Sequence, residues 1–203
     1  MQLLPTPESP INNNLIMDIR SGAIPVPVNN KYTLHPWFYF PLVAQSNNHP
    51  VVNNINPVKC EFASTIDTIT VNGIKKTPLL STSQYTSVLN VPAKIDMRTI
   101  FQGPEEKQFH NSYKTVALLL EGEFESLYKN RLPPEIDSIP EIKFKEKSQP
   151  TKMIVVSDGD VIRNFVQHST GRAYPLGFDI YTQQTYGNKN FIPLPVYIIV
   201  ITP

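Results

Sequence analysis

Two carboxylates directly after an apolar strand are the residues best suited to chemistry in this chain of 203 residues. The strand predicted over Met153–Val156 runs into Ser157-Asp158-Gly159-Asp160. Ligands of open α/β sheets bind beyond the carboxyl ends of strands, so a site is expected here. Asp158 and Asp160 could hold Mg²⁺ through a nucleotide phosphate, as metal-dependent nucleotide-sugar or phosphate enzymes do.

A second interpretation of Asp158 and Asp160 is structural. The aspartyl-phosphatase pattern needs threonine or valine two residues after the second aspartate, and the chain has Ile162 there. An EF-hand loop fails too, because Ile162 replaces the third oxygen ligand and no glutamate closes the loop. We therefore expect the carboxylates to accept hydrogen bonds from backbone N–H groups of the following turn rather than to hold a metal.

The loop from Thr170 to Lys189 follows these carboxylates and is rich in glycine and aromatic residues. Aromatic side chains suit an interface, because each adds a large contact area at low entropic cost. The alternative is that the same rings pack the loop onto its own sheet. The residues predicted to bind a ligand or a partner are Asp158, Asp160, Tyr174, Phe178, Tyr181 and Tyr186.

The other reactive residue types form no pattern that predicts catalysis. The single cysteine, Cys60, excludes an internal disulfide, and its alternation with Val58 and Phe62 predicts a buried side chain. The four histidines lack ligand spacing, and no phosphate-binding glycine motif or nucleophile elbow is present. No catalytic residue, resident metal or cofactor is predicted, and the protein is expected not to be an enzyme.

Composition limits the classes of partner. Hydrophobic residues make up 40% of the chain and charged residues 17%, with a formal net charge of +1. A core can therefore be buried, whereas the near-neutral charge argues against nucleic acid as a partner. The apolar tail Val196–Ile201 is too short to cross a membrane as a helix. The chain as it stands is expected to be soluble.

The elements that must position these residues are mostly strands. Twenty prolines divide the chain into short extended pieces, and helix is expected only in short segments such as Glu123–Lys129 and Val161–Val166. We predict one domain over 1–203, a β-rich α/β or α+β fold, with an exposed excursion at 131–150 that is rich in proline and charge. The predicted strands cover Ile11–Ile19, Trp37–Val43, Val58–Ala63, Ile66–Val71, Lys75–Ser81, Thr115–Leu120 and Lys152–Val156.

The amino-acid sequence of the chain resembles the periplasmic domain of the gliding-motility-associated ABC transporter auxiliary proteins of Bacteroidetes, the GldG family. Segments that are similar to the family's sequences extend from Ile11 to Phe191. The most specific are Lys152–Asn164, Tyr174-Pro175-Leu176-Gly177-Phe178-Asp179 and Tyr186-Gly187-Asn188-Lys189. Others are Ile11–Ile16, Trp37–Leu42, Glu61–Asp67, Leu118–Gly122 and Lys129–Pro134.

The resemblance implies a fold and a role. It implies a Rossmann-like sheet, similar to a glutamine-amidotransferase-like domain, of which this chain would be a fragment. It also implies an auxiliary or substrate-binding component at the periplasmic face of the inner membrane. Its partners would be ABC permease and ATPase subunits, and segments outside this chain would anchor it. The chain departs from the family after Phe191, where Pro193 and Pro195 stop a helix; a shifted reading frame or divergence would explain this.

Overall fold

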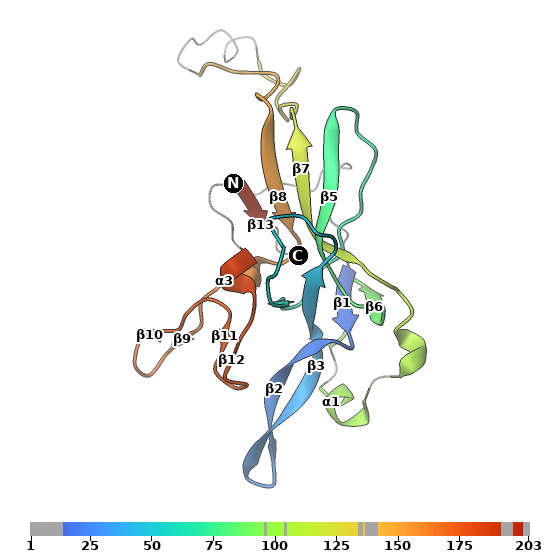
Figure 1. Ribbon diagram of the computed structural model, residues 1–203, viewed down its shortest axis with the longest axis vertical. Coiled ribbons are helices and arrows are strands. Elements are labelled where there is room, and N and C mark those ends of the chain that lie inside the picture. The colour runs from blue at the N-terminus through green and yellow to red at the C-terminus, as the bar shows by residue number, and fades with distance from the viewer. Residues whose placement is uncertain are drawn as a thin grey trace.

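The computed structural model describes residues 14–95, 97–103, 105–133, 136, 142–191 and 197–200. Its largest element is a seven-stranded sheet in the order β13-β8-β7-β5-β3-β2, with β4 paired to β3 (Figure 1). Strands β8 and β13 are parallel, and the other pairs of this sheet are antiparallel. The strands are β2 Ser21–Val28, β3 Lys31–Gln45, β4 Val58–Lys59, β5 Ile74–Ser81, β7 Thr115–Gly122, β8 Thr151–Val156 and β13 Tyr197–Val200.

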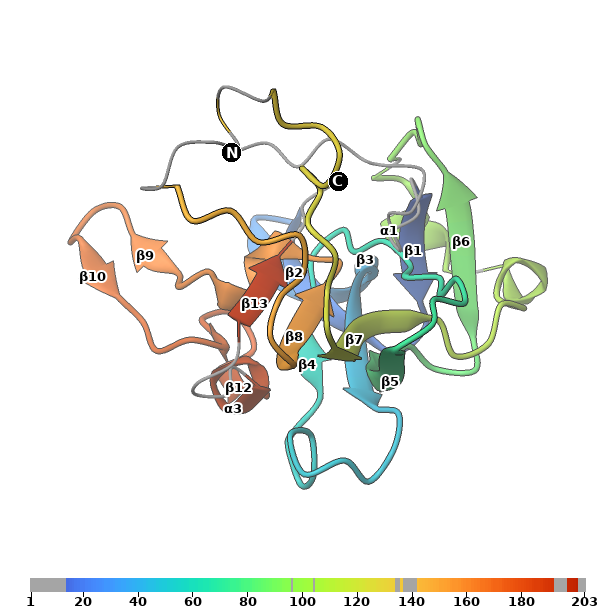
Figure 2. The same cartoon turned by 90° about the horizontal axis from the view of Figure 1, so that it is seen from above.

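Smaller elements surround this sheet. Figure 2 shows the β1–β6 pair and the β9–β10 loop on opposite sides of β8, β7 and β3. The three small antiparallel pairs are β1 Asn14–Asp18 with β6 Thr86–Asn90, β9 Val166–Gln167 with β10 Arg172–Ala173, and β11 Phe178–Asp179 with β12 Gln184–Thr185. The helical turns are α1 Thr99–Gln102, η1 Glu106–Gln108, η2 Gly159–Ile162 and α3 Asn188–Phe191.

Apolar alternation explains how the strands build the core. In β7, Leu119 faces the main core with Ile154 of β8, while Leu118 faces a smaller cluster with Val155 on the other side of the sheet. A continuous apolar run is what a strand covered on both faces requires. A third cluster packs β1, the β2–β3 hairpin and α1 around Trp37.

The predicted fold class is confirmed, since the chain is β-rich with few and short helices. The predictions for individual elements had mixed success. The helix predicted over Glu123–Lys129 is wrong, because Ser126 donates its backbone N–H to Glu146 O in an extended ribbon. The strand predicted over Ile66–Val71 is also wrong beyond one isolated bridge residue, Ile66. The strand β2 was not predicted, because Pro25 and Pro27 argue against a regular strand.

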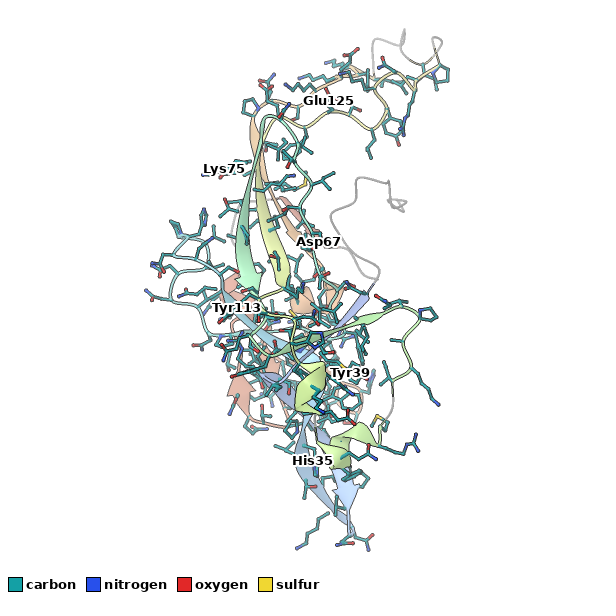
Figure 3. All side chains as sticks on the ribbon, turned by 90° about the vertical axis from the view of Figure 1, so that its right-hand side faces the viewer. His35, Tyr39, Asp67, Lys75, Tyr113 and Glu125 are labelled. Atoms are coloured by element: carbon teal, nitrogen blue, oxygen red, sulfur yellow. The ribbon has the colours of Figure 1, made fainter. Side chains whose placement is uncertain are left out.

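The molecule is elongated. Figure 3 shows His35 near one end, in the β2–β3 hairpin, and Glu125 near the other. Beyond Glu125 the chain returns over 142–150, where Ser148 donates its backbone N–H to Phe124 O at 2.9 Å. The exposure of the excursion at 131–150 as a whole stays a prediction, since 134, 135 and 137–141 lie outside the described residues. In the part of the chain that the structure describes, no helix has the length and apolarity needed to cross a membrane.

Candidate functional site

A cleft of about 280 Å³ lies beyond the carboxyl end of β8, where the sequence predicts a site. One wall comes from β2, β3, β4 and the segment after β4. The other comes from η2 and the β11–β12 loop, which Figure 1 shows close to α3. The lining residues are Ala23, Ile24, Phe40, Lys59, Glu61, Asp160, Arg163, Phe165, Gly177, Phe178, Asp179, Ile180, Tyr181, Tyr186 and Asn188.

Asp158 lies beneath this cleft and ties its two walls together. Its Oδ1 accepts a hydrogen bond from the backbone N–H of Asp160 at 2.8 Å, which caps η2. Its Oδ2 accepts from the backbone N–H of Glu61 at 2.7 Å. The prediction that this aspartate caps the following turn is therefore confirmed. Each carboxylate oxygen thus accepts one hydrogen bond from the backbone, which gives Asp158 a structural role.

Burial sets the protonation behaviour of the groups beneath the cleft. It raises the pKa of Asp158 to about 6, although the N–H groups of Glu61 and Asp160 act in the opposite direction. Burial, together with the nearby charge of Asp158, also raises the pKa of the Cys60 thiol well above its ordinary value. Cys60 is fully buried, as its alternation predicts. Its thiol is kept protonated and unreactive.

Asp160 behaves differently from Asp158. It lines the cleft, and its Oδ1 pairs with Arg163 Nη1 at 2.9 Å. The other nitrogen of the same guanidinium, Nη2, lies 2.7 Å from Glu61 Oε2. The expected acceptance of backbone N–H groups thus describes Asp158, whereas Asp160 serves an ion-pair network. Within the described residues, no group of three or more His, Cys, Asp or Glu side chains could hold a metal ion.

The centre of the cleft is an ion pair between Lys59 and Asp179. Lys59 Nζ lies 2.9 Å from Asp179 Oδ2 and 3.4 Å from Glu61 Oε1. The ammonium also lies over two rings, 5.0 Å from the centroid of Phe40 and 6.0 Å from that of Tyr186. Carboxylates and aromatic faces both stabilise a cation, so this lysine is surrounded by groups that favour its charge.

The pKa values of this pair follow from its geometry. Burial alone would lower the pKa of Lys59, but the hydrogen bond and charge of Asp179, with help from Glu61, raise it above its ordinary value. Burial would raise the pKa of Asp179, but the Thr182 N–H and the Lys59 ammonium lower it. Both groups are therefore charged at neutral pH, and Lys59 acts as a cation and hydrogen-bond donor rather than as a nucleophile.

Asn188, the first residue of α3, fixes the segment that follows β12 to the opposite wall. Its Oδ1 accepts from Lys59 N at 3.1 Å, and its Nδ2 donates to Lys59 O at 2.9 Å and to Val161 O at 3.2 Å. The amide side chain thereby pairs with the backbone as a neighbouring strand would. The preceding Gly187 makes this approach possible, since a Cβ there would overlap Asn56 O.

Four of the six predicted binding residues line the cleft: Asp160, Phe178, Tyr181 and Tyr186. Asp158 lies below them. Tyr174 lies behind the lining, stacked on Phe178 at a centroid distance of 5.5 Å and an interplanar angle of 6°. Phe165 and Arg172 contact the Tyr174 ring as well. For Tyr174 and Phe178 the geometry agrees with rings that pack the loop internally, whereas Tyr181 is 51% exposed.

Sequence reasoning found Asp160 but missed the other charged residues of the cleft: Lys59, Glu61, Arg163 and Asp179. One signal could have found two of them. Since Val58 and Cys60 are buried by alternation, Lys59 and Glu61 must lie on the opposite face of the same segment. A lysine and a glutamate side by side on one face could then have been read as part of a binding surface.

Comparison with known proteins gives the family. The model of the family described as an ABC-type uncharacterized transport system matches residues 8–193. No curated protein and no solved structure matches the chain. The matched segment includes every lining residue of the cleft. On this match, which covers most of its length, the chain belongs to the auxiliary-component family of ABC-type transport systems.

Proposed function

We propose that the protein is a non-enzymatic, extracytoplasmic auxiliary component of an ABC transporter related to the gliding-motility transporters. In this role it forms a complex with the permease and ATPase subunits and docks on the part of that complex that faces the same compartment. Family membership supports the transport context. The resemblance to the GldG proteins of Bacteroidetes supports the gliding-motility relationship, the periplasmic location and the anchoring by segments outside this chain.

The observation that carries the docking proposal is the exposed Tyr181 on a backbone that is held in place. Its N–H and that of Thr182 both donate to Asp179 Oδ1, at 2.9 and 3.1 Å. Asp179 is itself fixed by Lys59. The Tyr181 side chain is thus 51% exposed, while hydrogen bonds hold the backbone that carries it. Such a residue loses little conformational entropy when it binds a partner, and this property favours a role in an interface.

The enzymatic alternative, a metal-dependent nucleotide-sugar or phosphate enzyme that uses Asp158 and Asp160, gains no comparable support. Both carboxylate oxygens of Asp158 accept hydrogen bonds from backbone N–H groups, and Asp160 forms an ion pair with Arg163. A two-carboxylate metal site needs both side chains to turn toward one ion. In this geometry the two aspartates serve different partners.

Affinity capture tests the docking proposal. The protein is coexpressed with candidate permease and ATPase subunits of ABC transporters from the same genome, and the subunits retained on it are measured. Tyr181→Ala is expected to weaken their recovery severalfold, because aromatic anchors dominate binding energy. Tyr85→Ala is the matched control, since Tyr85 is 52% exposed and lies outside the cleft. A protein that purifies alone and turns over a nucleotide sugar or phosphoester contradicts the proposal and supports the enzymatic alternative.

The location is tested separately. Protease added to intact spheroplasts is expected to digest the protein, while a cytoplasmic marker stays intact. Digestion only after the inner membrane is ruptured contradicts an extracytoplasmic location.

A further inference from the structure

The β2–β3 hairpin has one face without charge. Its cross-strand pairs are Ala23–Pro36, Pro25–Leu34 and Pro27–Tyr32, which alternate with Ile24–His35, Val26–Thr33 and Val28–Lys31. Side chains of alternate pairs point to opposite faces of a two-stranded ribbon. The first three pairs therefore share a face, here named the apolar hairpin face, which consists of Ala23, Pro25, Pro27, Tyr32, Leu34 and Pro36.

The two faces of the hairpin have different surroundings. On the opposite face, Val26 is 8% exposed and belongs to the core cluster around Trp37. On the apolar hairpin face, Tyr32 is 78% exposed and Leu34 49%. The hairpin projects from the rest of the molecule (Figure 1). In the described part of the chain, the apolar hairpin face is thus left largely uncovered, which is unusual for six neighbouring apolar residues.

The apolar hairpin face is continuous with the cleft. Ala23 belongs to both, and Phe40, further along β3, lines the cleft with Phe178 and Tyr181. The apolar surface therefore runs from Tyr32 at the hairpin to the charged network around Lys59. A partner that covers one part of this surface is placed to reach the other.

The cleft has spare capacity to accept hydrogen bonds but little to donate them. Each of its cations is already bound by two carboxylates, Lys59 by Asp179 and Glu61, and Arg163 by Glu61 and Asp160. Asp160 Oδ1 faces Arg163, and among the described residues Oδ2 has no bonding partner. With three lining carboxylates against two cations, a positively charged donor complements the cleft better than an anion.

The edge of β2 excludes one mode of binding. Pro25 and Pro27 lack backbone N–H groups, so the outer edge of this strand cannot donate at two alternate positions. A partner strand added to this edge would leave its own carbonyls unpaired. Binding is therefore expected through side chains packed on the apolar hairpin face rather than through strand addition.

We propose that this combined surface binds a polypeptide segment of a transporter subunit, with a lysine or arginine side chain in the cleft and adjoining apolar residues on the apolar hairpin face. The inference rests on the proposed docking function and specifies its partner. The basic side chain donates to Asp160 and lies beside the rings of Tyr181 and Phe178, which also favour a cation. The neighbouring residues of the segment bury Leu34 and Tyr32.

The test uses two blocked peptides, N-acetyl-Arg-Leu-Leu-amide and N-acetyl-Glu-Leu-Leu-amide, titrated into the ¹⁵N-labelled protein. The arginine peptide is expected to shift the amide signals of the cleft and the hairpin. Asp160→Asn and Leu34→Ser are each expected to weaken its binding by roughly three- to fivefold, as for a partly exposed ion pair or a lost apolar contact. Glu105→Gln and Leu127→Ser are the controls, since Glu105 is exposed outside the cleft and Leu127 is 49% exposed, as Leu34 is.

Several results would overturn the inference. These are equal or stronger binding of the glutamate peptide, no signal shift with either peptide, or an unchanged affinity in Asp160→Asn. Leu34-dependent sedimentation with anionic phospholipid vesicles would assign the apolar hairpin face to lipid instead. A Leu34-dependent dimer in analytical ultracentrifugation would assign it to a second copy of this chain.

Capture of the transporter subunits separates the two proposals. If wild-type protein retains the permease and ATPase, and Asp160→Lys and Leu34→Ser retain them equally well, the docking function stands and this inference fails. If wild-type protein retains neither subunit, the docking function itself fails.

Discussion

The carboxylate of Asp158 accepts a hydrogen bond at 2.7 Å from the backbone N–H of Glu61, a residue 97 positions earlier in the chain. Its other oxygen accepts from Asp160 N, at the start of η2. One side chain therefore joins the two walls of the cleft. Because Asp158 is 3% exposed, water cannot replace it as an acceptor without a change in structure.

Asp158→Ala is expected to lower the free energy of unfolding by about 2–6 kcal/mol, since two N–H groups would lose their acceptor at about 1–3 kcal/mol each. Urea denaturation measures the change. Asp160→Ala is the control, and a loss below about 1 kcal/mol is expected because its ion pair with Arg163 is partly exposed. Equal losses in the two variants would show that Asp158 does not hold the walls together.

The pH dependence of stability should carry a contribution from Asp158. Its pKa rises from 3.8 to about 6 on folding, so the folded state binds this proton more tightly than the unfolded state. The contribution favours folding at low pH and is lost as pH rises from about 4 to 6, by about 3 kcal/mol in total. Asp158→Asn removes this titration.

Denaturation curves at several pH values check this sign. The unfolding free energy of wild type minus that of Asp158→Asn is expected to fall between pH 4 and 6 and to stay level above pH 7. The difference isolates this group, because the other carboxylates titrate in both proteins. A difference that rises with pH over the same window would mean that the hydrogen bonds outweigh burial and that the pKa is lowered.

The Lys59–Asp179 pair should show strong coupling in a double-mutant cycle. Lys59→Met leaves a carboxylate that is 3% exposed without its cation, so each single substitution should destabilise the protein. Combining it with Asp179→Asn should recover about 1–3 kcal/mol relative to additivity. The exposed pair Lys147–Glu123 is the control and should show much weaker coupling. Additive effects at Lys59 and Asp179 would contradict the assignment of this pair as the centre of the cleft.

Limited proteolysis should cut the excursion at 131–150 before the loops of the cleft. Lys143 and Lys145 are exposed, and the described part of this segment is held mainly by hydrogen bonds to 124–126. Mass spectrometry of early trypsin fragments identifies the first site. First cleavage after Arg172, in the β9–β10 loop, would mean that the cleft is the less stable part.

The sequence was most informative where one segment decides its own structure. The apolar runs at Thr115–Leu120 and Lys152–Val156 predicted β7 and β8, and the aspartate after β8 predicted the capped turn. β2 was missed because its prolines are tolerated only at the edge of a sheet, and edge position is a property of the whole fold. Within the apolar tail, the described residues Tyr197–Val200 form β13.

The candidate site was predicted in part for the same physical reason. Asp160, Phe178, Tyr181 and Tyr186 lie close together in the last quarter of the sequence, so local composition revealed them. Lys59 and Asp179 are 120 residues apart, and no local pattern states that they meet. Alternation indicates that Lys59 lies opposite Cys60. Its partner Asp179 is set by how the segment that contains β11, β12 and α3 folds back onto β4.

The path of the chain through the cleft has a consequence for how the protein could be divided. Five lining residues precede the excursion at 131–150, namely Ala23, Ile24, Phe40, Lys59 and Glu61, and the others follow it. The cleft is thus a seam between two halves that also meet along the β7–β8 strand pair. A break in the excursion would give two complementing fragments, each with one wall and neither with a binding site. Reassembly of the fragments would then restore the cleft and the strand pair together.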